Sequence, residues 1–259
     1  IAGCSCEGTI ATVSVPVRVM LEGPYDASTG LMNDALRGLA AFPLSDPYPA
    51  LGYTHTGGST GSISPAVLSV SGDDAITDWV LIELRDANDA GTVVSSRSAL
   101  LQRDGDVVDL DGTSPVAFAV GQANYYVAAL HRNHLGCMTG TSVSISSTSL
   151  LVDLTTSTTA TFGTDARKSV TGAVPVEVLW SGDVNFDGVL KYTGTDNDRD
   201  PILIAIGGTV PTNTTDGYRA EDVNLDGTVK YTGTDNDRDP ILINIGGVVP
   251  TNSRSAQLP

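Results

Sequence analysis

The chain has 259 residues, and 30 Asp and Glu against 14 Lys and Arg give it a formal net charge of −16. Apolar residues make up 41% of the sequence, enough for a core in one large all-β domain or two smaller domains. A chain with this excess of acidic residues lacks the basic face that neutralises phosphates. We therefore expect neither nucleic-acid binding nor attraction to an anionic membrane. The sequence has no apolar run near the roughly 20 residues of a membrane-spanning helix, so insertion is not expected.

The N-terminus predicts export. The first residue is Ile1 rather than methionine, which indicates that a secretion signal has been removed and that the protein is extracellular. Cysteine is sparse, with Cys4, Cys6 and Cys137. One disulfide from Cys137 to Cys4 or Cys6 is typical of an exported protein, and three free or buried thiols are the alternative.

Residues 1–22 form an N-terminal extended segment. From Ala11 to Leu21 every second residue is apolar, which predicts a half-buried strand. Pro16 lies on its polar side and lacks an N–H, which suits an edge strand. The strand pairs either within its own chain or, as a donor strand, with a neighbouring copy, and head-to-tail exchange would build an open filament. Residues 23–60 are expected to connect this segment to the domain that follows, and to contain a short helix at 31–41.

Residues 61–180 are predicted to form an antiparallel β-sandwich. Apolar or alternating runs at 76–84, 92–101, 116–120 and 124–131 predict strands, and Asp-, Asn- and Gly-rich turns separate them. The Ser- and Thr-rich stretch at 139–164 is either O-glycosylated or a polar sheet face. Asn213 opens an N-glycosylation sequon, so the protein is a candidate glycoprotein.

Residues 181–259 contain a duplicated unit, with copies at 181–213 and 220–252. The block KYTGTDNDRDPILI occurs at 191–204 and again, unchanged, 39 residues later at 230–243. Residues 182–213 and 221–252 differ at six of 32 positions. Such near-identity indicates two units with the same role. In each copy an apolar run after a proline, ended by two glycines, predicts a short helix that packs against the sister copy.

Both copies begin with Asp-x-Asn-x-Asp-Gly, a pattern that predicts a calcium loop. Oxygen side chains at alternate positions converge when the loop coils, the glycine permits the sharp turn, and the next residue offers its carbonyl. Hard oxygen ligands select Ca²⁺ over softer metals. The expected ligands are Asp183, Asn185, Asp187 and the Val189 carbonyl in the first loop, and Asp222, Asn224, Asp226 and the Thr228 carbonyl in the second.

These loops do not end like an EF-hand, because Gly194 and Gly233 stand where an EF-hand has its twelfth-position acid. We expect a longer loop closed by a later acid. The candidates are Asp198 or Asp200 in the first repeat and Asp237 or Asp239 in the second. Without a cation these acids would repel one another, so we expect at least one Ca²⁺ per repeat; ion-free Asp/Asn-Gly turns are the alternative.

The duplicated GDVNFDG-type loop with a short apolar helix resembles the dockerin type of calcium-binding repeat. The longer version, with KYTGTDNDRDPIL inserted, is similar to the C-terminal repeats of large secreted bacterial surface proteins, and segments 21–36 and 125–136 resemble companion pieces of that family. The resemblance implies a small calcium-stapled module with short helices. Dockerins bind a cohesin partner, but the loop length and short helices here depart from their pattern.

An enzyme is not expected. The three histidines, His55, His131 and His134, have no nucleophile motif or convincing acid pair beside them. We expect His131 on a strand and His134 in a turn. The acids Asp104, Asp106, Asp109 and Asp111 are interpreted as hairpin-turn residues rather than as another calcium site.

These features predict a mainly β, secreted, calcium-binding structural protein of the cell surface that assembles with copies of itself into a fibril or surface layer. The alternative is an adhesion or binding module, either carbohydrate-binding or a dockerin-like anchor, with surface glycans or another surface protein as partner. Low aromatic content argues against a sugar platform. An exposed cluster of Trp79, Tyr125 and Tyr126 would favour one.

Overall fold

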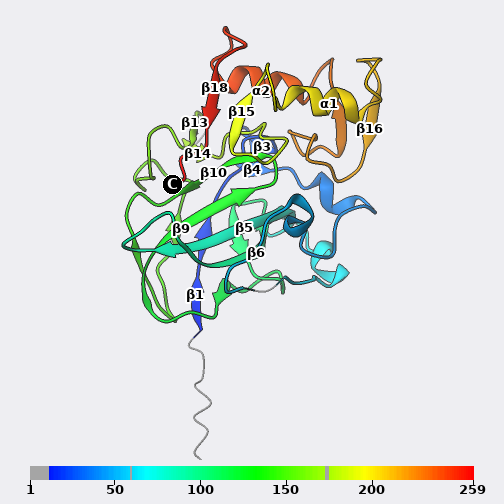
Figure 1. The fold of residues 1–259 in the computed structure, drawn as a ribbon. Coiled ribbons are helices and arrows are strands. Elements are labelled where there is room, and N and C mark those ends of the chain that lie inside the picture. Colours follow the sequence, from blue (N-terminus) through cyan, green and yellow to red (C-terminus); the bar gives the residue numbers. More distant parts are fainter. Residues whose placement is uncertain (1–11, 59, 173–174) are drawn as a thin grey trace, which may run out of the picture.

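The computed structural model describes residues 12–58, 60–172 and 175–259. Its centre is a curled sheet in the order β10-β9-β5-β6-β7-β2-β12, with β11 also paired to β9 (Figure 1). Its strands are β2 (Val17–Arg18), β5 (Ile76–Asp86), β6 (Val93–Gln102), β7 (Asp106–Val108), β9 (Ala123–His131), β10 (His134–Met138), β11 (Val143–Ile145) and β12 (Val152–Asp153).

Smaller elements surround this sheet. The two-stranded sheets pair β1 (Val13–Val15) with β8 (Val116–Phe118), β3 (Tyr25–Asp26) with β4 (Leu31–Met32), β13 (Lys168–Val170) with β14 (Val176–Val178), β15 (Val189–Lys191) with β18 (Ser253–Ser255), and β16 (Thr214–Asp216) with β17 (Thr228–Lys230). The helices are α1 (Arg199–Ala205), α2 (Arg238–Asn244) and the short 3₁₀ turns η1 (Ala35–Gly38), η2 (Tyr48–Leu51) and η3 (Pro65–Ser69). Neither α1 nor α2 has the length and apolarity to cross a bilayer, and the described residues contain no other α-helix.

The chain is mainly β, as predicted, and the four strands expected between 76 and 131 are present as β5, β6, β8 and β9. The two-layer sandwich is not confirmed. Strand β5 is buried along nearly its whole length and is paired with β6 on one side and β9 on the other. Its centre, residues 79–82, is four consecutive apolar residues rather than an alternation, and the polar residues Asp78 and Glu83 beside it are buried as well.

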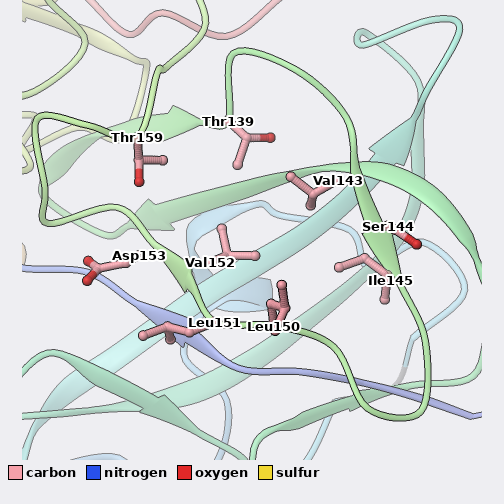
Figure 2. Close-up of a pocket in the computed structure, with 9 residues that line it drawn as sticks. All are labelled: Thr139, Val143, Ser144, Ile145, Leu150, Leu151, Val152, Asp153 and Thr159. Atoms are coloured by element: carbon pink, nitrogen blue, oxygen red, sulfur yellow. The ribbon is translucent and has the colours of Figure 1, made fainter.

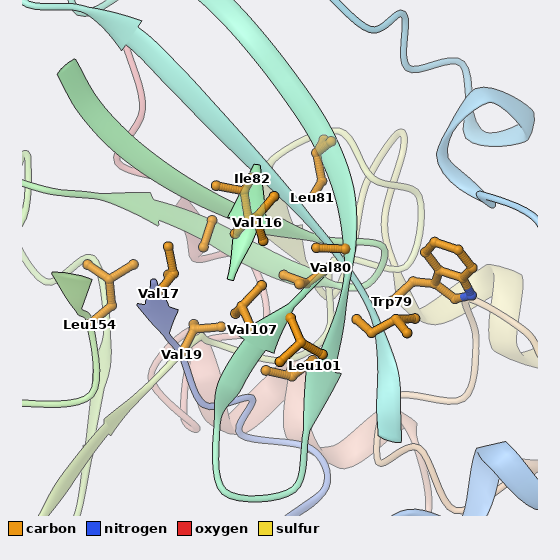
Figure 3. Close-up of a cluster of buried hydrophobic side chains, with 14 of the residues drawn as sticks. Val17, Val19, Trp79, Val80, Leu81, Ile82, Leu101, Val107, Val116 and Leu154 are labelled. Atoms are coloured by element: carbon orange, nitrogen blue, oxygen red, sulfur yellow. The ribbon is translucent and has the colours of Figure 1, made fainter. Parts of the chain in front are cut away.

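The N-terminal strand lies inside the central core. Val13, Val15, Val17 and Val19 are each at most 2% exposed, so the alternating pattern marks the buried face as predicted. Strand β1 pairs with β8, whereas β2 lies between β7 and a parallel neighbour, β12. Figure 3 shows Val17 and Val19 beside Val107 in this core.

The edge position expected for the N-terminal strand holds for part of it, and the helix expected at 31–41 was wrong. Strand β1 is at an edge, because it forms a two-stranded sheet with β8, whereas β12 covers the outer side of β2. Pro16 separates β1 from β2, and its carbonyl accepts a hydrogen bond from Val152. Residues 31–41 do not form one helix. They contain β4 and η1, because the Asn33 side chain accepts the Ala35 N–H in a local turn that competes with a helix.

Residues 1–11, with Cys4 and Cys6, lie outside the described part of the chain. Among the described residues Cys137 has no disulfide partner; its thiol is completely buried on β10, and burial raises its pKa to about 12.

The two repeats interlock at one end of the central sheet, where α1 and α2 lie side by side (Figure 1). Strand β16, which follows the first repeat, pairs with β17 of the second; β18, which follows the second repeat, pairs with β15 of the first. Each helix packs on the other copy's strand, and Val184, Ile202, Val223 and Ile241 share one small core. The expected packing between sister copies is therefore confirmed, and each repeat is completed by the other.

Candidate metal centres in the duplicated loops

The first loop coils so that its oxygen side chains face the backbone N–H groups of the turn. Asp183 accepts hydrogen bonds from the N–H groups of Asp187 and Gly188, at 3.1 and 3.0 Å. Asn185 Oδ1 accepts from the same Asp187 N–H at 3.0 Å, and Asp187 Oδ1 accepts from Val189 at 2.8 Å. Left-handed backbone at Phe186 and Gly188, with φ of 58° and 78°, makes the coil tight.

The second loop reproduces these contacts. Asp222 accepts from Asp226 and Gly227 at 3.1 and 2.8 Å, and Asp226 accepts from Thr228 at 2.8 Å. In both copies the asparagine amide also donates to a late backbone carbonyl: Asn185 to Asp196 at 3.1 Å and Asn224 to Asp235 at 2.9 Å. No sequence pattern points to these two carbonyls, because only the coiled backbone brings them to the loop.

Of the two late acids considered for the first loop, Asp198 lies in it and Asp200 does not. Asp198 is fully buried and accepts from Val184 at 2.9 Å and from Lys191 at 2.8 Å. The carboxylate of Asp200 is half exposed and pairs with Arg199. The second repeat is arranged in the same way: Asp237 accepts from Val223 and Lys230, while Asp239 pairs with Arg238.

Buried acids gather in each loop. Burial, together with the nearby Asp198 and Asp187 carboxylates, raises the pKa of Asp183 to about 7. Burial likewise raises the pKa of Asp198 to about 6, that of Asp222 to about 6 and that of Asp237 to about 7. Such shifts mean that these carboxylates are costly to ionise without a compensating cation.

The donor set fits a hard cation. It consists of carboxylate, amide and backbone oxygens, and a carboxylate oxygen that accepts one N–H keeps a second lone pair. In the ranges that the structure describes, no three His, Cys, Asp or Glu side chains are grouped so as to hold a metal by themselves. An ion here would therefore depend also on Asn185 or Asn224 and on the carbonyls of Val189 or Thr228, which open β15 and β17.

The hairpin turn between β9 and β10 holds both loops against the sheet. The Asn133 carbonyl accepts from the backbone of Gly182 and Asp183 in the first loop, at 2.9 and 3.1 Å. Its side-chain amide donates to the carbonyls of Ala220 and Asp222 before the second loop, at 2.9 and 2.7 Å. One residue therefore contacts the entry to both loops.

Beside Asn133 lies a buried polar cluster. The Gly23 N–H donates to Nε2 of His134 at 3.1 Å, so the proton of this neutral ring is on Nδ1, which lies 3.1 Å from Nδ1 of His131. Nε2 of His131 is 3.1 Å from Asp78, which also binds Arg132 at 3.0 Å. Burial lowers the pKa of both histidines. The hydrogen bonds of this cluster connect the β9–β10 hairpin to β5 through Asp78 and to the N-terminal segment through Gly23.

A second histidine cluster has no signal in the sequence. His55 joins Asp46 at 2.8 Å to Ser96 at 3.1 Å, although 41 residues separate His55 from Ser96. The Ser96 side chain is fully buried and also accepts the Thr56 N–H at 3.0 Å. The three residue types are those of a hydrolytic triad, but this hydroxyl is beneath the protein surface. The hydrogen bonds of His55 and Thr56 to Ser96 hold the loop at 54–58 against β6.

The apolar pocket of about 320 Å³ in Figure 2 lies between β11 and β12. Its wall is largely aliphatic, from Val143, Ile145 and residues 150–152, and it contains one ionisable side chain, Asp153. Asp153 is already bonded to Thr155 at 2.8 and 2.6 Å. The aromatic cluster considered for sugar binding is not formed, because Trp79 is completely buried and its Nε1 donates to Pro43.

None of the protein-family models, curated proteins or solved structures with which the chain was compared matches it.

Proposed function

We propose that this chain is a secreted calcium-binding structural protein that assembles with copies of itself at the cell surface into a fibril or layer. The observation that carries the proposal is the recurrence of one buried arrangement of oxygen atoms in two loops. Bound Ca²⁺ would neutralise the crowded carboxylates. Asp183, Asn185, Asp187, Asp198 and the Val189 carbonyl would hold it in the first repeat, and Asp222, Asn224, Asp226, Asp237 and the Thr228 carbonyl in the second.

We propose further that residues 181–259 are a dockerin-like module that calcium stiffens. In each copy the late acid bonds both to the start of the loop and to the following strand, as Asp198 does to Val184 and Lys191. A cation at this acid would therefore connect the loop, the strand and the helix that begins at Arg199. Because strands of the two repeats pair with one another, a calcium ion that stiffens one repeat would also stabilise the other repeat of the same chain.

The N-terminal strand provides a route to assembly. Its buried valines and its backbone pair with β8, β7 and β12. The same strand from a neighbouring copy would make the same contacts, which is donor-strand exchange. Exchange in one direction along a row of copies gives an open filament, because each copy donates one strand and receives another.

Electron microscopy and light scattering of the purified chain, in calcium and in chelator, test this proposal. We expect ordered assemblies in calcium that loosen in chelator. The double variant Asp183→Ala with Asp222→Ala should behave like the chelated protein, and Asp73→Ala, which removes an exposed acid outside the loops, should not. Particles that stay monomeric at high concentration in calcium would refute self-assembly, and calorimetry showing no calcium binding would refute the metal sites.

A second candidate function is anchoring to another surface protein. Ile204 and Ile243 occupy equivalent positions on α1 and α2 and are 70% and 59% exposed. Because α1 and α2 lie side by side, these two side chains would form an apolar contact surface if a partner covered both. A chain that binds calcium but remains monomeric, and whose binding to a surface extract is lost in Ile204→Asp with Ile243→Asp, would favour this alternative.

A further inference from the structure

The carboxylate of Glu22 lies between a side-chain amine and a side-chain amide from distant parts of the chain. Lys168 Nζ forms a close ion pair with Glu22 Oε1 and donates to Oδ1 of Asn244 at 2.9 Å. The Nδ2 of Asn244 donates to Glu22 Oε2 at 2.6 Å. The Glu22 carboxylate therefore contacts both Lys168 Nζ and Asn244 Nδ2, and Lys168 Nζ also contacts the side-chain carbonyl oxygen of Asn244.

The cluster is held firmly and largely shielded from water. Asn244 is 1% exposed, and the side chains of Lys168 and Glu22 are 25% and 17% exposed. Ser181 donates to Glu22 Oε2 through its N–H and its hydroxyl, each at 3.0 Å. The Trp180 ring lies 5.3 Å from Lys168 Nζ and covers it. An amine fixed against an amide in this way has the proximity that accelerates an intramolecular reaction.

We propose that Lys168 and Asn244 form a covalent isopeptide bond, with Glu22 as the catalytic acid–base. Glu22 takes a proton from the Lys168 ammonium, and the neutral amine attacks the Asn244 side-chain carbon. Glu22 then transfers protons from the attacking nitrogen to Nδ2. The bond from that carbon to Nδ2 breaks and the bond to Nζ remains. Ammonia leaves as ammonium and the carboxylate is regenerated, so the reaction needs no oxidant, metal or other reactant.

The difference between the two repeats supports this assignment. Asn244 is one of the six positions at which the copies differ, and the first copy has Ala205 there. Within the part of the chain that the structure describes, the hydrogen-bond partners of the Asn244 side chain are Glu22, Lys168 and Ser181, which all lie outside the repeats' own calcium loops. The bond would link β13 to the C-terminal end of α2 and so fix the repeat module to the body of the protein. It does not depend on calcium.

Intact-mass measurement of the reduced, full-length chain tests the proposal directly. We expect the protein to be lighter than its sequence by one ammonia. Trypsin should then release a branched peptide that joins residues 168–191 to residues 239–254, because an acylated lysine is not cleaved. A chain of full mass that yields the separate peptides after prolonged incubation would overturn the proposal, and so would an ammonia loss at any other pair of residues.

Variants identify the roles of the three groups. Lys168→Arg keeps the positive charge, Asn244→Ala reproduces the sister repeat, and Glu22→Gln keeps the shape of the proton carrier; each should leave the chain at its full sequence mass. Lys191→Arg, a lysine on β15 away from the cluster, should still lose ammonia. Loss of ammonia that persists in Lys168→Arg would contradict the assignment, whether or not the other variants fold.

Discussion

The side-chain amide of Asn133 donates a hydrogen bond of 2.7 Å to the backbone carbonyl of Asp222. Because the same residue's carbonyl accepts two N–H groups from the first loop, both repeats are attached to the sheet at one turn of the β9–β10 hairpin. The turn is fully buried, so these groups have no water to replace a lost partner.

Replacing Asn133 by Asp should therefore loosen the module. The carboxylate cannot donate to the Ala220 and Asp222 carbonyls, and an unpaired buried group costs about 1–3 kcal/mol, or more when charged. We expect a lower denaturant midpoint and faster hydrogen exchange in residues 181–252 than in β5. Asn88→Asp, in an exposed turn, is the matched control and should leave both unchanged. Equal exchange in the two variants would show that the hairpin does not hold the module.

The two late acids of each loop should differ in their effect on calcium binding. Asp198→Ala removes a buried oxygen donor from the loop, whereas Asp200→Ala removes a half-exposed carboxylate that pairs with Arg199. We expect the first variant to weaken calcium binding at that repeat by at least tenfold in calorimetry, and the second to change it less than about threefold, as for a surface ion pair. A larger effect of Asp200→Ala would place the closing ligand two residues later, at Asp200.

Calcium should remove the loss of stability that rising pH causes in the ion-free loops. The pKa of Asp183 is about 7 in the folded chain, whereas that of an aspartate in the unfolded chain is about 3.9. Between these two pH values Asp183 is protonated in the folded state and ionised in the unfolded state. Stability from this group is present below pH of about 4 and is lost as pH rises through about 7.

In chelator, the midpoint of unfolding should therefore decrease as the pH is raised from about 5 to about 8. In saturating calcium the fall should disappear, because the ion favours ionised carboxylates. Both solutions contain the same chain, so the difference between the two curves reports the groups that calcium affects. Parallel curves would mean that calcium does not contact these acids.

How far the sequence predicts this structure depends on the range of the interactions. The strands β5 and β9, the buried face of residues 13–21 and the helices α1 and α2 follow from local patterns of apolar residues, prolines and glycines. The tight coil of both loops follows from Asp-x-Asn-x-Asp-Gly, a pattern within six residues.

The rest depends on contacts between distant segments. Nothing local shows that Asp198, rather than Asp200, turns into the loop, since both acids precede the same apolar run. The exchange of β16 and β18 between repeats, and the meeting of Glu22, Lys168 and Asn244, arise only when three regions of the chain pack together. The sequence shows that Asn244 replaces Ala205 of the first repeat, but it does not show which residues Asn244 contacts.

Removing the last strand should affect the first repeat more than the second. Strand β18 pairs with β15, so a chain ending at residue 252 leaves the first repeat's strand unpaired although that repeat's own sequence is intact. We expect hydrogen exchange to increase at residues 189–191 and to change little at 228–230, where β16 remains. An increase confined to the second repeat would contradict the exchanged pairing.

Gly23 should be the least replaceable glycine near the second loop. A Cβ at this position would lie 2.0 Å from the Val223 carbonyl oxygen, and the Gly23 N–H is already bonded to His134. The backbone of the N-terminal segment therefore touches the second loop with no room for a methyl group. Gly23→Ala should cost about 1–3 kcal/mol, the range for overpacking a filled site.

Gly38→Ala is the matched control, because a Cβ there meets no atom within 4 Å. Chemical denaturation of the two variants measures the difference, which should appear as a lower midpoint for Gly23→Ala alone. Calcium binding at the second loop should weaken in the same variant, since Val223 lies between the ligands Asp222 and Asn224. If Gly23→Ala were as stable as Gly38→Ala, the close approach of Gly23 to the Val223 carbonyl would not exist in solution.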